Sequence, residues 1–380
     1  MLRAVVTLFI YWVVSTLLQI GPTLYAQPFQ ALIPSSGEVS GAPEPTPIPR
    51  RSVVWQVQSR DAIYDYQVNA PTVRSMVDKL VKATTGEPTV AAAWASLVKP
   101  TDAVGIKVCA NGAPLFSTHP AVVSAIVAGL SEAGVPAEHI VVWDREEQKL
   151  KAAGYRAKGG GYRLMSTEDN YDPQGILTSP IAGKLIYGDL LFVGKQPVNL
   201  KKKADPKDKN RVWRSAMDNL SDQSHISRVL TQVVTKVINV PVLSDHVYCG
   251  LSGALFNMTI QNVDNWRRLV QPPENGDPSM PEAYTDPRIS SKVVLHIMDG
   301  LVALYAGGPI GNTNYAIQYG TLYASKDPVA VDAVAIQKID QWRVSAKLDP
   351  ASKSAKWLQT SFVYGLGNAD LSRIEIRNIH

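Results

Sequence analysis

Two histidines and both cysteines of the chain carry side chains that soft metal ions prefer. His246 and Cys249 are three residues apart, and both could reach one metal ion if the turn between them is helical. Cys109 and His119 belong to an earlier segment and would complete the ligand set if the two segments meet. Because thiolate and imidazole ligands favour zinc or copper, one interpretation is a single zinc or copper ion held by these four residues.

A second set of polar side chains suits acid–base chemistry. Lys107 lies in an otherwise apolar run, and a buried ammonium needs either an anionic ligand or a structural carboxylate beside it. Asp299 follows another apolar run, where it could bind a metal ion or a hydroxyl group, or could cap a helix. With His246 as acid, base or ligand and Asn257 as a further polar group, these residues form the predicted catalytic set.

The same residues also allow a noncatalytic interpretation. A pocket would then bind a small molecule without changing it, and Cys109 and Cys249 would form a disulfide that joins two loops. A disulfide and a thiolate metal site exclude each other because they use the same sulfur atoms. Two cysteines are too few for an all-cysteine iron–sulfur cluster, so no iron–sulfur cluster is expected.

The elements that must position these residues begin with a strand, a helix and a second strand. Residues 103–108 and 139–143 are short apolar runs typical of buried strands. Between them, apolar residues recur at helical spacing from Pro120, which suits a first helical turn, to Gly134, which suits a helix end. A βαβ unit of this kind predicts two parallel strands joined by a right-handed crossover.

Later segments continue this alternation. We expect strands at 233–240, 293–298 and 320–324, a helix at 223–230, and a helix from Pro328 through Ile339. The sequence therefore predicts an α/β protein with a mostly parallel open sheet and helices on both faces. Ligands of such sheets bind beyond the carboxyl ends of the strands, so we expect the site there, built from Lys107, His119, His246, Asn257 and Asp299.

The N-terminal segment resembles an export signal. Arg3 precedes an apolar run and Ala26 suits a cleavage site, so residues 1–26 are expected to be a secretory signal peptide. The protein would then be periplasmic or extracellular. If the segment is not cleaved, residues 4–20 would anchor the protein in a membrane, and no other membrane contact is expected.

The remaining chain is expected to contain a linker and one domain. Residues 27–52 form a proline-rich linker, and residues 53–380 form a single α/β domain with a charged insertion near 199–214 and a long loop near 271–287.

Charge and motifs exclude some function classes. Lysine and arginine number 38 against 33 acidic residues, and this net charge of +5 is too small and dispersed to favour a nucleic-acid partner. A small-molecule ligand is the expected partner. The sequence contains no Gly-rich phosphate loop, His-Glu-x-x-His helix or Gly-x-Ser-x-Gly turn, so no common catalytic motif names a reaction.

Several motifs in order resemble domain-of-unknown-function family DUF362, in particular its exported bacterial members without ferredoxin cysteines. The matching segments are 104–108, 117–120, 142–145, 238–243, 245–246, 253–255, 257–258, 299–300, 307–309, 325–332 and 365–367. The resemblance runs from about Val53 to the C-terminus and implies no particular reaction, because the chemistry of the family is largely unassigned. The family usually has lysines where this chain has Ser244 and Phe256, and asparagine where it has Cys109, which weakens any anion site implied by the resemblance.

Overall fold

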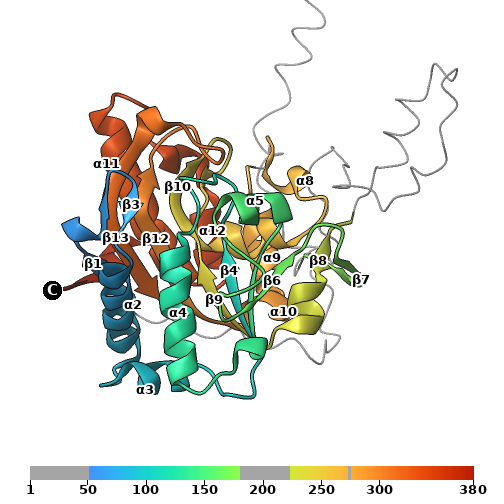
Figure 1. The fold of residues 1–380 in the computed structure, drawn as a ribbon. Helices are drawn as coiled ribbons and strands as arrows, with labels where there is room; N and C mark the ends of the chain where they lie inside the picture. Colours follow the sequence, from blue (N-terminus) through green and yellow to red (C-terminus); the bar gives the residue numbers. More distant parts are fainter. Residues whose placement is uncertain (1–50, 180–222, 273–274) are drawn as a thin grey trace, which may run out of the picture. The chain divides into compact units, whose positions relative to one another are not determined.

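A ten-stranded sheet runs through the part of the protein that the computed structural model describes, residues 51–179, 223–272 and 275–380 (Figure 1). Its main path is, in spatial order, β14 (Ile374–Ile379), β1 (Ser52–Gln58), β13 (Ala316–Ser325), β12 (Val293–Leu304), β9 (Lys236–Val240), β4 (Val104–Val108), β5 (Ile140–Asp144) and β6 (Arg163–Ser166). Off this path, β10 (Val242–His246) pairs with β12 and with β11 (Gly250–Leu251). Most neighbours are parallel, and β13 is antiparallel to both β1 and β12. The predicted α/β class with a mostly parallel sheet is confirmed.

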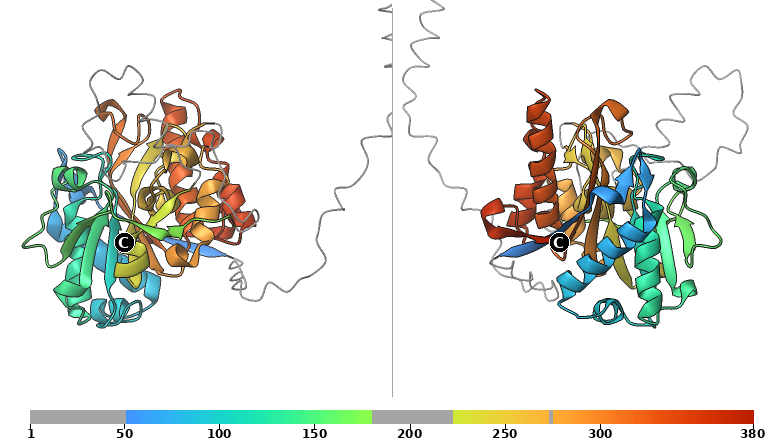
Figure 2. Two further views of the ribbon diagram at one scale, coloured as in Figure 1. Left: turned by 90° about the vertical axis from the view of Figure 1, so that its right-hand side faces the viewer. Right: turned by 60° about the vertical axis from the view of Figure 1, so that its left-hand side comes forward.

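Helices cover both faces of this sheet, as predicted (Figure 2). One face packs against α2 (Ala70–Thr85), α3 (Val90–Ala95), α4 (Pro120–Glu132) and α5 (Glu147–Ala152). The other face packs against α7 (Ala254–Met258), α8 (Arg267–Val270), α9 (Ser279–Thr285), α10 (Pro287–Ser290), α11 (Pro328–Ser345) and α12 (Trp357–Val363). Two small hairpins lie outside the main sheet, β2 (Ile63–Tyr64) with β3 (Gln67–Val68), and β7 (Tyr171–Ile176) with β8 (His225–Ser227).

The predicted βαβ unit consists of β4, α4 and β5. β4 and β5 pair in parallel, with Lys107 opposite Trp143. Alternation along β4 sends Ile106 and its even-numbered neighbours into the core under α4, and sends Lys107 to the opposite face. This alternation decides which face each polar residue reaches.

Three predicted elements differ from the structure. The predicted helix at 223–230 is wrong, because residues His225–Ser227 form β8 and Val229–Val233 form one π-helical turn. The predicted long loop at 271–287 contains helix α9, whose residues are mostly buried against the core. The strand expected to end before Asp299 continues to Leu304, because its second half pairs with β10 and β13.

Three predicted segments fall wholly or mostly outside the described residues. The signal peptide at 1–26 lies there with most of the linker at 27–52, and so does the charged insertion at 199–214. Within the described part, β1 begins at Ser52, next to the predicted domain start. No described helix combines the length and the apolar character needed to cross a bilayer.

Candidate functional site

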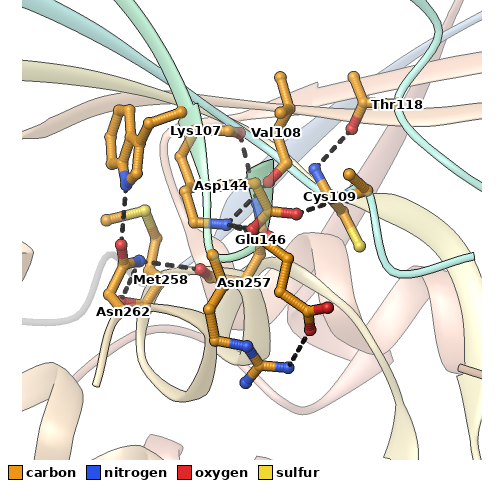
Figure 3. Close-up of polar contacts among 12 residues, drawn as sticks. Lys107, Val108, Cys109, Thr118, Asp144, Glu146, Asn257, Met258 and Asn262 are labelled. Atoms are coloured by element: carbon orange, nitrogen blue, oxygen red, sulfur yellow. Dashed lines mark hydrogen bonds and ion pairs between the residues drawn. The ribbon is translucent and has the colours of Figure 1, made fainter. Parts of the chain in front are cut away.

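Lys107 lies in a closed polar cluster between β4, β5 and α7 (Figure 3). Its side chain is 0% exposed, and its Nζ donates to Asp144 Oδ1 at 2.6 Å, Val108 O at 2.7 Å and Asn257 Oδ1 at 3.0 Å. An ammonium has three protons, so these three acceptors use all of them. Of the two interpretations of Lys107, an anionic ligand or a structural carboxylate beside it, these contacts match the structural carboxylate.

Asn257 belongs to the same buried network. Its Nδ2 donates to Asn239 Oδ1 at 2.7 Å, and Asn239 Nδ2 contacts His296 Nδ1 at 3.0 Å. The register places Lys107, Asn239 and His296 side by side on β4, β9 and β12, on the face that α7 covers. Asn239 Nδ2 also donates to Ala254 O at the start of α7. These contacts attach a five-residue helix to three strands of the sheet.

Asp299 caps helix α4 from the neighbouring strand β12. Its Oδ2 accepts hydrogen bonds from the His119 backbone N–H and from His119 Nδ1, each at 2.8 Å. His119 is the N-cap residue, and its own side chain makes no capping hydrogen bond. Burial acts to lower the pKa of His119, but the Asp299 carboxylate and its hydrogen bond outweigh burial and raise that pKa above its ordinary value. Of the two interpretations of Asp299, this contact matches helix capping.

The four predicted metal ligands do not come together. His246 ends β10 and Cys249 lies in the turn to β11, so the segment between them is a β-hairpin and not the helical turn that metal binding by this pair would need. Among the described residues, no group of three or more His, Cys, Asp or Glu side chains is placed to hold a metal ion.

The disulfide of the noncatalytic interpretation is also not formed. Both Cys109 and Cys249 are free and buried. Burial raises the pKa of the Cys109 thiol to about 11 and raises that of Cys249 further above its usual range.

A cleft of about 690 Å³ opens where the parallel strands β10 and β12 end. Its polar lining residues include Asp245 and His246 from β10 and Arg343 from α11, and the segment 306–310 after β12 contributes Gly307 and Gly308. Apolar side chains such as Val247, Ile310 and Leu348 line the rest. The location at the carboxyl ends of strands is the one that the sequence predicted for His246.

The His246 ring is fixed by its backbone surroundings. Its Nδ1 is 3.2 Å from the N–H nitrogen of Tyr248 and 3.3 Å from that of Cys249, and both N–H groups donate to it. The ring also packs against Phe256, with centroids 4.8 Å apart. Burial lowers the pKa of His246 to about 4, so the imidazole is neutral at neutral pH. A neutral ring that accepts at Nδ1 carries its proton on Nε2, and Nε2 has no partner among the described residues.

Asp245 lies beside His246 and is held by the glycine turn. Its Oδ1 accepts a hydrogen bond from the Gly308 N–H at 2.8 Å. A side chain at position 308 would overlap the backbone oxygen of Asp245, so only glycine permits this approach. Burial raises the pKa of Asp245 to about 6, although Gly308 and Arg343 act in the opposite direction.

Arg343 is one of two basic residues that line the cleft, and the other, Lys353, pairs with Asp349. Arg343 Nε donates to Asp349 O at 2.6 Å and its Nη1 donates to Tyr305 O at 3.0 Å, so two backbone carbonyls orient the guanidinium. The nearest carboxylate oxygen, Asp245 Oδ2, is 3.6 Å away, which is longer than a hydrogen bond. The guanidinium therefore keeps donors for a ligand.

Part of this cleft was predicted from the sequence. His246 was in the predicted catalytic set, and Gly307 and Gly308 stood in a segment resembling a family motif. Arg343 was missed, because it lies near the end of a long helix with no motif around it. Asp245 was visible only as the neighbour of His246, and its position shortly after the expected strand at 233–240 was the available signal.

The fold and this strand-end cleft define an α/β protein with a pocket of mixed polar and apolar lining at the carboxyl edge of its sheet. The chain matches the model of "Domain of unknown function (DUF362)" over residues 195–337, which confirms the resemblance inferred from its motifs. No curated protein matches the chain.

The chain resembles a solved structure at low similarity. This is the crystal structure of a protein from Thermotoga maritima, determined by a structural genomics consortium, with 12% sequence identity and a TM-score of 0.40. The match covers 75% of this chain and 61% of that protein, so the chain spans less than two thirds of its length.

Proposed function

We propose that the protein binds a small anionic molecule in the cleft between the ends of β10 and β12. The observation that carries this proposal is the pair of oriented donors at the cleft, His246 Nε2–H and the Arg343 guanidinium. Backbone groups hold both side chains, so little conformational entropy is lost when a ligand binds. A carboxylate or phosphate accepts hydrogen bonds from such donors, and the apolar lining suits a short hydrocarbon part beside the anionic group.

Acid–base catalysis on that ligand is a second candidate function. Asp245 is the observation that favours it, because a carboxyl group with a pKa of about 6 can both release and take up a proton near neutral pH. Asp245 would transfer the proton, His246 would donate a hydrogen bond to the developing negative charge, and Arg343 would hold the anionic end. Noncatalytic binding needs only the two donors.

Ligand-observed NMR with a library of small carboxylates and phosphate esters tests the binding proposal. We expect at least one compound to bind the protein. The NMR signal that reports its binding should be lost in the Arg343→Met variant. Arg74→Met is the matched control, because Arg74 lies on α2 in pairs with Asp78 and Glu132, outside the cleft. Absence of binding, or equal loss in both variants, would contradict the proposal.

Export is the second part of the proposed function. It is supported by the order of charged, apolar and small residues in positions 1–26. Intact-mass measurement of the protein from the exported fraction should give a chain that begins at Gln27. A membrane-bound chain that keeps residues 4–20 would favour the anchored alternative.

A further inference from the structure

A groove of about 510 Å³ lies between α11 and the strands β13, β1 and β14, outside the cleft described above. Five of its lining residues carry amide side chains, namely Gln56, Gln58, Gln337, Gln341 and Asn378. Lys338 is the one charged residue among its described lining residues, which include no carboxylate. The composition differs from that of the first cleft, which contains several charged groups of both signs.

Most of the amide groups are available to a ligand. Gln58 Nε2 donates to Tyr319 O at 3.1 Å, and Gln341 Oε1 accepts from Lys338 Nζ at 3.3 Å. These contacts occupy only part of each amide, since an amide side chain has two donors and an acceptor with two lone pairs. The side-chain amides of Gln56, Gln337 and Asn378 have no hydrogen-bond partner in the described part of the chain.

Two tyrosines give the groove an aromatic corner. The Tyr319 and Tyr323 hydroxyl groups are 2.8 Å apart, and the Tyr319 ring meets Trp342 edge-on with centroids 5.0 Å apart. Lys338 Nζ lies 5.3 Å from the centre of the Tyr319 ring, within cation–π range. The lysine is therefore engaged by an amide and a ring, which reduces its availability to an anion.

We propose that this groove binds a neutral carbohydrate. Each sugar hydroxyl both donates and accepts a hydrogen bond, and amide side chains offer both functions at one site. The apolar C–H face of a sugar ring packs on an aromatic side chain, and Tyr319, which lines the groove and meets Trp342 edge-on, supplies such a surface. The absence of carboxylates from the described lining argues against a cationic ligand, and one engaged lysine argues against a polyanion.

Isothermal titration calorimetry tests the proposal with four probes, maltohexaose, cellohexaose, chitohexaose and mannohexaose. We expect at least one of them to bind the full protein with a Kd below about 1 mM. The double variant Gln337→Ala/Gln341→Ala should weaken this binding by about tenfold or more, because two amide contacts are lost. Gln359→Ala on α12 is the matched control and should leave the Kd unchanged, since Gln359 is exposed and lies outside the groove.

Two further titrations distinguish the alternatives. A neutral, terminally blocked hexapeptide of glycine, asparagine and serine tests a peptide ligand, and its binding in place of every saccharide would overturn the proposal. The Arg343→Met variant should bind the saccharide as the unmodified protein does, so failure of the anion site and failure of the groove are separable. Lack of binding by all four saccharides, or binding unaffected by the double variant, would also overturn the proposal.

Discussion

Asp144 joins the buried ammonium of Lys107 to the first residue past Cys109. Its Oδ1 accepts from Lys107 Nζ at 2.6 Å, and its Oδ2 accepts from the Ala110 N–H at 2.6 Å. One carboxylate therefore neutralises a buried charge on β4 and fixes the start of the loop that follows β4. Because both side chains are excluded from water, solvent stabilises neither charge, and their other hydrogen bonds come from neutral groups.

Removing the ammonium should destabilise the protein strongly. Lys107→Met leaves the Asp144 carboxylate buried and unpaired, so the free energy of unfolding should fall by about 3–5 kcal/mol in urea denaturation. Lys151→Met is the matched control, because Lys151 pairs with Glu147 at the surface and should cost less than about 0.5 kcal/mol. Equal stabilities of the two variants would show that Lys107 is not the structural partner of Asp144.

His296 should make stability depend on pH on the acid side. Burial lowers the pKa of His296 to about 3 in the folded protein, whereas in the unfolded chain it is near 6.5. The unfolded chain therefore takes up a proton that the folded protein does not, and this contribution to stability is lost as pH falls below about 6.5.

The variant His296→Asn should reduce this pH dependence. The asparagine oxygen can accept from Asn239 in place of the ring Nδ1, so the network is kept while the titrating group is removed. In urea denaturation between about pH 4 and 6.5, its slope should be smaller by up to about 1.4 kcal/mol per pH unit. A slope equal to that of the unmodified protein would show that His296 does not carry this pH dependence.

Gly308 should be essential for the anion site. In Gly308→Ala, the added methyl group overlaps the backbone of Asp245, so the turn after β12 must move away from β10. We expect the ligand found by NMR to lose at least about tenfold in affinity, with a circular dichroism spectrum like that of the unmodified protein. Unchanged affinity would mean that the contact between this turn and Asp245 does not shape the site.

The two thiols should be unreactive in the folded protein. Burial raises the pKa of both Cys109 and Cys249, so little thiolate is present, and neither sulfur is accessible. Iodoacetamide should label neither cysteine near neutral pH and both after unfolding in urea, as read by mass spectrometry. A bridged species in the unreduced protein would contradict the structure.

The sequence predicted the parts of the fold that local patterns determine. The unit β4–α4–β5 follows from two apolar runs and a helix with proline in its first turn, and these signals need no distant partner. The predicted helix at 223–230 failed because β8 forms by pairing with β7, a partner distant in sequence. Helix α9 was missed because its segment contains prolines and has few strongly apolar residues.

The site was predictable only for residues that follow the carboxyl ends of strands, where open α/β sheets bind their ligands. His246 was found because strands end side by side at the carboxyl edge, whereas Arg343 reaches the same cleft only through the packing of α11. The sequence indicated that a carboxylate could pair with Lys107, but not which one. The register between β4 and β5 decides this, because it places Trp143 opposite Lys107 and Asp144 one residue further along. Asp299 likewise met His119 through tertiary packing, because β12 does not end where its apolar run suggested.

The tautomer of His246 is the most direct test of the proposed anion site. In the protein labelled with nitrogen-15 histidine, long-range proton–nitrogen NMR near pH 7 should show His246 with an unprotonated Nδ1 and a protonated Nε2, still neutral near pH 5.5. His246→Gln assigns the signal among the six histidines. Addition of the bound carboxylate or phosphate should shift the Nε2–H resonance. A proton on Nδ1, or an Nε2–H resonance that no ligand shifts, would contradict the account of this cleft.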